Sequence, residues 1–180
     1  MTPSASRGNL MVWNNTTRVY HGTLDIHAVN VANRPNPNLG RSAADFGKGF
    51  YVTSSLHQAR QWANQKVRTW PSSRGPVNAA VLEFEMDWDW PNASVFDVLS
   101  FVIDDTPFHE FVILNRLGGT KHKRSGAHAF DMVVGPVAAF PQTLTYANCD
   151  QICFAASGGN VTAALQQLTH LRTNIASPLF

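Results

Sequence analysis

The chain contains 180 residues, of which 44% are hydrophobic and 14% are charged, and its formal net charge is +2. This composition indicates a folded domain with an apolar core and excludes a disordered chain. The net charge is too small to indicate a nucleic-acid partner by itself. No run of about 18 apolar residues and no amino-terminal signal pattern occurs. We therefore expect no membrane span, and a protein that is cytoplasmic or delivered into a target cell by a specialised secretion system.

Strand, helix and loop patterns alternate along the chain without an internal repeat. Residues 1–11 are expected to form a flexible tail before a single domain over residues 12–180. Strands are predicted at residues 12–13, 18–23, 50–53, 79–86, 130–138 and 151–155. Helices are predicted at residues 25–32, 56–67, 107–117 and 161–171, whereas residues 94–103 fit either a strand or a helix. Loops are predicted at residues 34–41, 70–76 and 121–124. The excess of strands predicts an α+β domain.

Residues 45–63 form the most informative stretch, because a glycine loop, a short strand and a helix follow one another there. Ser55 and Gln58 have the spacing of a capping box at the start of the helix. Tyr51 on the strand and Trp62 on the helix could flank a flat ring. The alternative is that both aromatic side chains are ordinary core residues.

A second helix start is marked by Thr106 and Pro107, with Thr106 predicted as the N-cap and Pro107 as the first helical residue. Gly118 follows as a stop signal. Glu110 is then a first-turn residue, where the helix dipole favours a carboxylate.

The two cysteines, Cys149 and Cys153, are too far apart along one strand for an easy disulfide and too few for a zinc site. We interpret them as reduced packing residues.

The strongest signal is a combination of short motifs. Tyr20-His21-Gly22-Thr23 is followed about thirty residues later by Gly-Lys-Gly-Phe-Tyr51, and Trp62 stands eleven residues after Tyr51. This order resembles the first two motifs of ADP-ribosyltransferases of the diphtheria toxin and poly(ADP-ribose) polymerase type, the His-Tyr-Glu/Gln group. The chain also resembles an uncharacterised bacterial domain family within that superfamily, through motifs at residues 45–51, 58–63, 111–116, 131–138 and 151–154.

The resemblance implies an ADP-ribosyltransferase-like fold, in which split antiparallel β-sheets with flanking helices form a central cleft for NAD. NAD would be the co-substrate, and no metal is expected. His21 would bind the adenosine ribose, the backbone of Gly22 would bind the nicotinamide amide, and Thr23 would support the first strand. Tyr51 and Trp62 would hold the nicotinamide ring between them.

Two residues compete for the third motif position, where relatives carry a glutamate that binds the nicotinamide ribose and supports the charged transition state. Glu110 has a similar local sequence, but its helical context argues against it. Gln151 opens a late strand and matches the last motif of the uncharacterised bacterial family, so we favour Gln151 and keep Glu110 as the alternative. Arg18, with its planar guanidinium, is a candidate partner of the NAD pyrophosphate.

The sequence therefore predicts a mono-ADP-ribosyltransferase that acts as a toxin or effector domain. The acceptor is expected to be a protein side chain, while a nucleic-acid acceptor stays open. Arginine is disfavoured as the acceptor, because Cys149 and Phe108 stand two residues before the two candidates, where arginine-modifying relatives carry Glu or Gln. A non-catalytic module that binds NAD or ADP-ribose and an NAD glycohydrolase are the alternatives.

Overall fold

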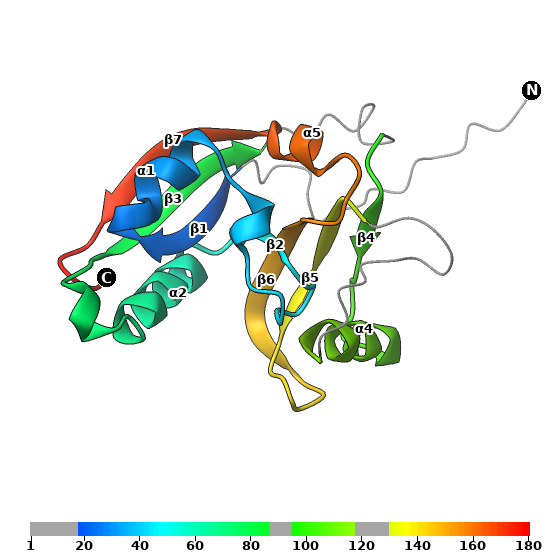
Figure 1. Ribbon diagram of the computed structural model, residues 1–180. Helices are drawn as coiled ribbons and strands as arrows, with labels where there is room; N and C mark the ends of the chain where they lie inside the picture. Colours follow the sequence, from blue (N-terminus) through cyan, green and yellow to red (C-terminus); the bar gives the residue numbers. More distant parts are fainter. Residues whose placement is uncertain (1–17, 87–94, 118–129) are drawn as a thin grey trace, which may run out of the picture.

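The computed structural model describes residues 18–86, 95–117 and 130–180 (Figure 1). The predicted tail over residues 1–11, the strand at 12–13, the stop signal at Gly118 and the loop at 121–124 lie outside these residues. The described chain is an α+β structure with two mostly antiparallel sheets. The predicted α+β class is therefore confirmed.

The first sheet has the strand order β1-β3-β7 and is antiparallel throughout. Its strands are β1 (Arg18–Leu24), β3 (Ala79–Met86) and β7 (Leu168–Ile175). The second sheet has the order β2-β6-β5-β4, and only the pair β4 and β5 is parallel. Its strands are β2 (Gly49–Val52), β4 (Val98–Ser100), β5 (Met132–Ala138) and β6 (Thr145–Ala155).

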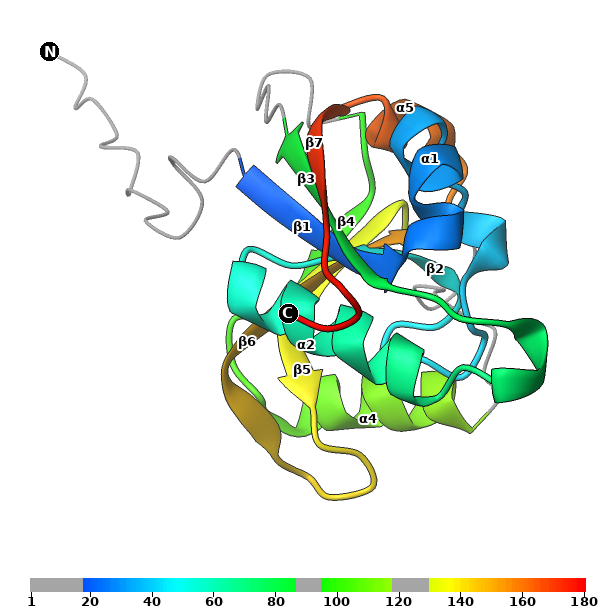
Figure 2. The same cartoon turned by 90° about the vertical axis from the view of Figure 1, so that its left-hand side faces the viewer.

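Helices flank both sheets. They are α1 (Asp25–Asn33), α2 (Leu56–Arg68), α4 (Thr106–Arg116) and α5 (Val161–Leu165), with short 3₁₀ helices at Pro37–Leu39 and Ser72–Arg74. Helices α1 and α2 lie on opposite sides of the first sheet, and α4 lies beside the second sheet (Figures 1 and 2). No described helix is long and apolar enough to cross a membrane.

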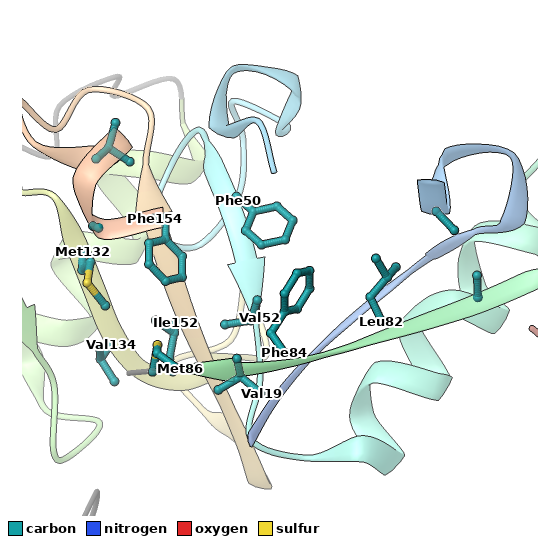
Figure 3. Packing of buried hydrophobic residues seen from close by; sticks show 14 residues of the cluster. Val19, Phe50, Val52, Leu82, Phe84, Met86, Met132, Val134, Ile152 and Phe154 are labelled. Atoms are coloured by element: carbon teal, nitrogen blue, oxygen red, sulfur yellow. The ribbon is translucent and has the colours of Figure 1, made fainter. Parts of the chain in front are cut away.

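The main core lies between the two sheets. Because successive strand residues point to opposite faces, Leu82, Phe84 and Met86 of β3 all point to this interior. Phe84 meets Phe50 of β2 edge to face, with ring centroids 6.2 Å apart. Figure 3 shows these side chains facing those of β5 and β6 across the interior. Burial of this shared cluster holds the two sheets together.

Two smaller clusters lie on the outer faces. On the second sheet, Phe108 and Val112 of α4 pack with Phe46 and Cys153. On the first sheet, Ala59 and Ala63 of α2 pack against β3. Small alanine side chains allow the α2 backbone to approach the sheet closely, which matters for the candidate site.

The predicted helix over residues 161–171 is wrong in its second half. The helix ends at Leu165, and residues from Leu168 form β7, which pairs with Ala80–Met86 of β3. The leucine spacing fitted a helix, but Thr169, Thr173 and Ile175 are β-branched residues that also suit a strand. Pairing with β3 decides the outcome.

Two helix starts differ in detail from the predictions. Asp105, not Thr106, is the N-cap of α4, because its carboxylate accepts a hydrogen bond from the Phe108 N–H at 3.2 Å. Ser55 caps α2 as predicted, through a 3.2 Å bond from the Gln58 N–H. The Gln58 side chain, however, does not complete the capping box, because its amide bonds the backbone N–H and C=O of Asp150 instead.

Two strands were only partly anticipated. The ambiguous residues 94–103 contain β4. Strand β6 begins at Thr145, six residues before the predicted start. The prediction missed its first half because exposed residues such as Tyr146 and the left-handed Asn148 (φ 56°) leave no apolar alternation there.

Candidate functional site

The two sheets separate at a single backbone bridge between β1 and β2. The Tyr20 N–H donates to the Thr53 carbonyl at 2.8 Å, and the Thr53 N–H donates to the Tyr20 carbonyl at 3.0 Å. Continuing this antiparallel register would place Gly22 opposite Tyr51, but among the described residues the pairing stops at the bridge. We call the opening between Tyr20–Gly22 and Tyr51–Thr53 the fork.

His21 spans the fork with its side chain. Its Nδ1 lies 2.6 Å from the Tyr51 carbonyl oxygen, and because a carbonyl only accepts, Nδ1 carries the proton. The ring also stacks on Phe50, with centroids 4.6 Å apart and planes 26° apart. Burial and the positive charge of Lys66 lower the pKa of His21 to about 3, although the Tyr51 carbonyl acts in the opposite direction. The imidazole is therefore neutral at physiological pH, and Nε2 is a hydrogen-bond acceptor.

Gly22 presents its backbone to the fork. Peptide groups alternate sides along a strand, so the N–H and C=O of Gly22 point to the same side as those of Tyr20, away from β3. A Cβ atom here would lie 2.1 Å from the Ala59 carbonyl oxygen of α2, so only glycine fits. The Gly22 carbonyl accepts a 2.6 Å hydrogen bond from Lys66 Nζ. Desolvation of the ammonium group at this contact lowers the pKa of Lys66 to about 8, although the residue as a whole is exposed.

Tyr51 is anchored by its hydroxyl to the preceding glycine loop. The hydroxyl donates to the Gly47 carbonyl at 2.7 Å and accepts from the Phe46 N–H at 3.1 Å. Burial, with further effects from Cys153, holds the Tyr51 pKa well above its usual value. The hydroxyl therefore stays protonated and fixes the position of the ring.

The other two predicted binding residues on these elements lie nearby. Trp62 is half-buried on α2, four residues before Lys66, and so shares a helix face with it. No ring contact joins Trp62 to Tyr51 in the part of the chain that the structure describes. Thr23 is buried in β1, opposite Ala80.

The structure separates the two candidates for the third motif position. Gln151 is buried on β6, the neighbour of β2, and its side chain lies on the same sheet face as Tyr51, because Cys153 is the direct partner of Tyr51. Tyr51 and Gln151 are thus diagonal neighbours. Glu110 is an exposed residue of α4, as its helical context predicted, and no described contact brings it to the fork.

Arg18 belongs to an ion-pair network on the first sheet. It hydrogen bonds the carboxylate of Glu83, which also accepts a 2.5 Å bond from Arg172 Nε. Burial raises the pKa of Glu83, but the hydrogen bonds from the two arginines outweigh this effect and lower it. Binding of a pyrophosphate by Arg18 would require this pair to open.

The sequence-based reasoning missed three polar residues next to the site. Lys66 gave no signal beyond its helical spacing from Trp62. Asp45 and Asp150 each begin or adjoin a quoted motif, and both carboxylates accept several hydrogen bonds. Asp150 Oδ1 accepts from Thr53 Oγ1 at 2.6 Å and from the Ser54 N–H at 3.0 Å, which ties β6 to the end of β2.

A hollow of about 510 Å³ lies beside the fork, over the first half of β6. Its lining includes Ser54, Val102–Asp104 and Thr145–Asp150, but none of His21, Gly22 or Tyr51. It is open to solvent and carries exposed apolar side chains. We locate the candidate site at the fork and not in the hollow, because fixed polar groups and aromatic rings converge at the fork.

The cysteines are free, as predicted. Cys153 is buried in the outer cluster of the second sheet, and burial raises its pKa to about 12. Cys149 borders the hollow, and burial together with Asp150 raises its pKa. Neither thiol is activated as a nucleophile.

Comparison with protein families assigns the chain to one of them. A family model described as a protein of unknown function (DUF3990) matches residues 17–157, so the chain belongs to this family. The matched range runs from β1 to the end of β6 and includes the fork and Gln151. A search of curated proteins found no match.

Proposed function

We propose that this member of the DUF3990 family is a mono-ADP-ribosyltransferase that cleaves NAD and transfers ADP-ribose to a macromolecular acceptor. The two sheets that separate at the fork would form the cleft for NAD. The acceptor would be a protein side chain other than arginine, and the domain would act as a toxin or effector.

The hydrogen bond from His21 Nδ1 to the Tyr51 carbonyl carries this proposal. It fixes the tautomer of a neutral imidazole, so that Nε2 can accept a hydrogen bond from a ribose hydroxyl. On the other side of the fork, the Gly22 backbone offers a donor and an acceptor, which match the two ends of a carboxamide. These groups have the chemistry that the resemblance assigned to them.

The proposed reaction exchanges one bond at the ribose. The bond from nicotinamide to the ribose carbon breaks, and nicotinamide leaves as a neutral molecule with the bonding electrons. The ribose becomes an oxocarbenium-like cation, to which the acceptor nucleophile adds with loss of its proton. Tyr51 and Trp62 would orient the leaving ring, and Gln151 would hold the ribose.

A module that binds NAD without cleaving it is the second candidate, and the uncharged Gln151 favours it. Gln151 brings no negative charge to stabilise the cationic sugar, which weakens catalysis more than binding. Lys66 Nζ already occupies the Gly22 carbonyl, so a bound carboxamide must replace this hydrogen bond in either case.

Incubation with labelled NAD and a whole-cell lysate tests the proposal. The wild-type protein is expected to label a discrete target and to release nicotinamide. Tyr51→Ala and Gln151→Ala should each reduce labelling by about 100-fold or more, because misplacing the substrate removes its productive geometry. Glu110→Ala is the control and should leave labelling unchanged.

The other outcomes separate the alternatives. Nicotinamide release without labelled target would indicate an NAD glycohydrolase. Binding of NAD without release would establish the non-catalytic module. Loss of label in Glu110→Ala alone would assign the third motif position to Glu110.

A further inference from the structure

A buried carboxylate, Asp45, gathers several of the quoted motifs into one polar cluster. Asp45 is 3% exposed and lies in the glycine loop before β2. Its Oδ1 accepts from Arg116 Nε at 2.7 Å, and its Oδ2 accepts from the Ala138 N–H at 2.9 Å and from Gln151 Nε2 at 2.7 Å. Each carboxylate oxygen therefore has a partner, and Arg116 balances the charge.

The same cluster fixes the amide of Gln151. Nε2 donates one hydrogen to Asp45 Oδ2 and the other to the Pro136 carbonyl at 2.9 Å. An amide has two N–H donors, and both are used. Turning the amide over would place Oε1 against two oxygen acceptors, so the orientation is set by chemistry.

The remaining atom of the amide, Oε1, accepts no hydrogen bond from the described residues. Gln151 is only 4% exposed. Oε1 nevertheless keeps some contact with solvent, because Asn115 Oδ1 is the only fully buried side-chain polar atom without a partner in the described part of the chain. Gln151 therefore offers an incoming molecule an acceptor and no donor.

We infer that Asp45 is a positioning residue, which holds Gln151 so that only Oε1 faces a ligand and the site selects a hydroxyl donor there. The inference rests on the proposed function, in which that donor is a hydroxyl of the nicotinamide ribose. An unconstrained glutamine could present either end of its amide. Asp45 thus gives an uncharged side chain the acceptor-only character of a carboxylate, at a diagonal position to Tyr51.

The test measures binding of NAD and of two analogues, each lacking one hydroxyl of the nicotinamide ribose. The wild-type protein should bind at least one analogue about 10-fold more weakly than NAD, the equivalent of one hydrogen bond. In Asp45→Asn, an amide can donate to Gln151 and release its orientation. This variant should weaken NAD binding and reduce the discrimination to less than about 3-fold.

Asp131→Asn is the matched control. Asp131 is an equally buried aspartate that accepts from the Asn160 and Asp97 N–H groups at 2.6 and 2.9 Å, away from Gln151. It should keep the discrimination of the wild-type protein. A purely structural role of Asp45 would weaken all three ligands equally and would overturn the inference.

The wild-type measurement can overturn the inference even where Asp45→Asn does not fold. Equal binding of NAD and both analogues would overturn the role of Gln151 Oε1 and the inference with it, while the proposed function would stand. Failure of the wild-type protein to bind NAD at all would overturn both.

Discussion

The neutral His21 makes the stability of the protein dependent on pH in a defined range. Its pKa of about 3 in the folded protein lies below the ordinary value of 6.5. Between these values the unfolded chain binds a proton that the folded chain does not. The contribution of His21 is therefore fully present above pH 6.5 and is lost as the pH falls toward 3.

The magnitude follows from the size of this shift. At about pH 4.5 the full shift would cost about 3 kcal/mol of the free energy of unfolding. Because the ring is partly exposed, solvent screening reduces the expected cost to about 1–2 kcal/mol. His21→Gln removes the titrating group and keeps an N–H donor for the Tyr51 carbonyl.

Urea denaturation at about pH 7 and about pH 4.5 provides the assay. The stability advantage of the wild-type protein over His21→Gln should shrink by about 1–2 kcal/mol at the lower pH. His57→Gln, at an exposed histidine of α2, serves as the control for general effects of acid. An unchanged difference between wild type and His21→Gln at both pH values would refute the burial of a neutral imidazole at the fork.

Three further substitutions test the packing around the site, each by urea denaturation. Gly22→Ala should lower the free energy of unfolding by about 3 kcal/mol, because its Cβ would meet the α2 backbone at 2.1 Å. Gly159→Ala, with open space around it, should be neutral, and equal effects of the two would contradict the close approach of α2. Glu83→Gln should lower the free energy of unfolding by about 2–3 kcal/mol, because two arginines lose their buried counter-charge. Glu85→Gln, at an exposed position, should lower it by less than about 0.5 kcal/mol, and similar losses would contradict the ion-pair network around Glu83. Asn115→Leu should be neutral or stabilise the protein by about 1 kcal/mol, because it removes a buried carbonyl oxygen without a described partner. A large loss of stability would show that this oxygen accepts a hydrogen bond.

The parts of the fold that depend on local chemistry could be predicted from the sequence. Ser55 caps α2 through a bond to the Gln58 N–H, three residues away. The stretch Ala79–Met86 alternates and forms β3, and Pro107 stands in the first turn of α4. Each of these signals acts between residues a few positions apart, so the local sequence is enough to predict the structure there.

The parts that depend on distant partners could not be predicted. Residues 168–171 have helical leucine spacing, yet they form a strand because β3 offers an unpaired edge. Gln58 turns from its predicted bond to the backbone of Asp150, 92 residues away. No spacing rule indicates which of two competing partners a side chain takes.

The candidate site shows the same division. The family resemblance implied that His21, Gly22 and Tyr51 lie at one site, and in the structure the three residues lie at the fork. Lys66 on the Gly22 carbonyl and Asp45 behind Gln151 were not anticipated, because both contacts depend on how α2 and the glycine loop pack against the strands.

The most direct test of the account is a crystal structure of the protein with an NAD analogue that cannot be cleaved. We expect the carboxamide on the backbone of Gly22, with Lys66 Nζ displaced, and a ribose hydroxyl within hydrogen-bond distance of His21 Nε2. A ligand bound in the hollow over β6, with Lys66 still on Gly22 and the fork empty, would contradict the central claim that the fork is the NAD site.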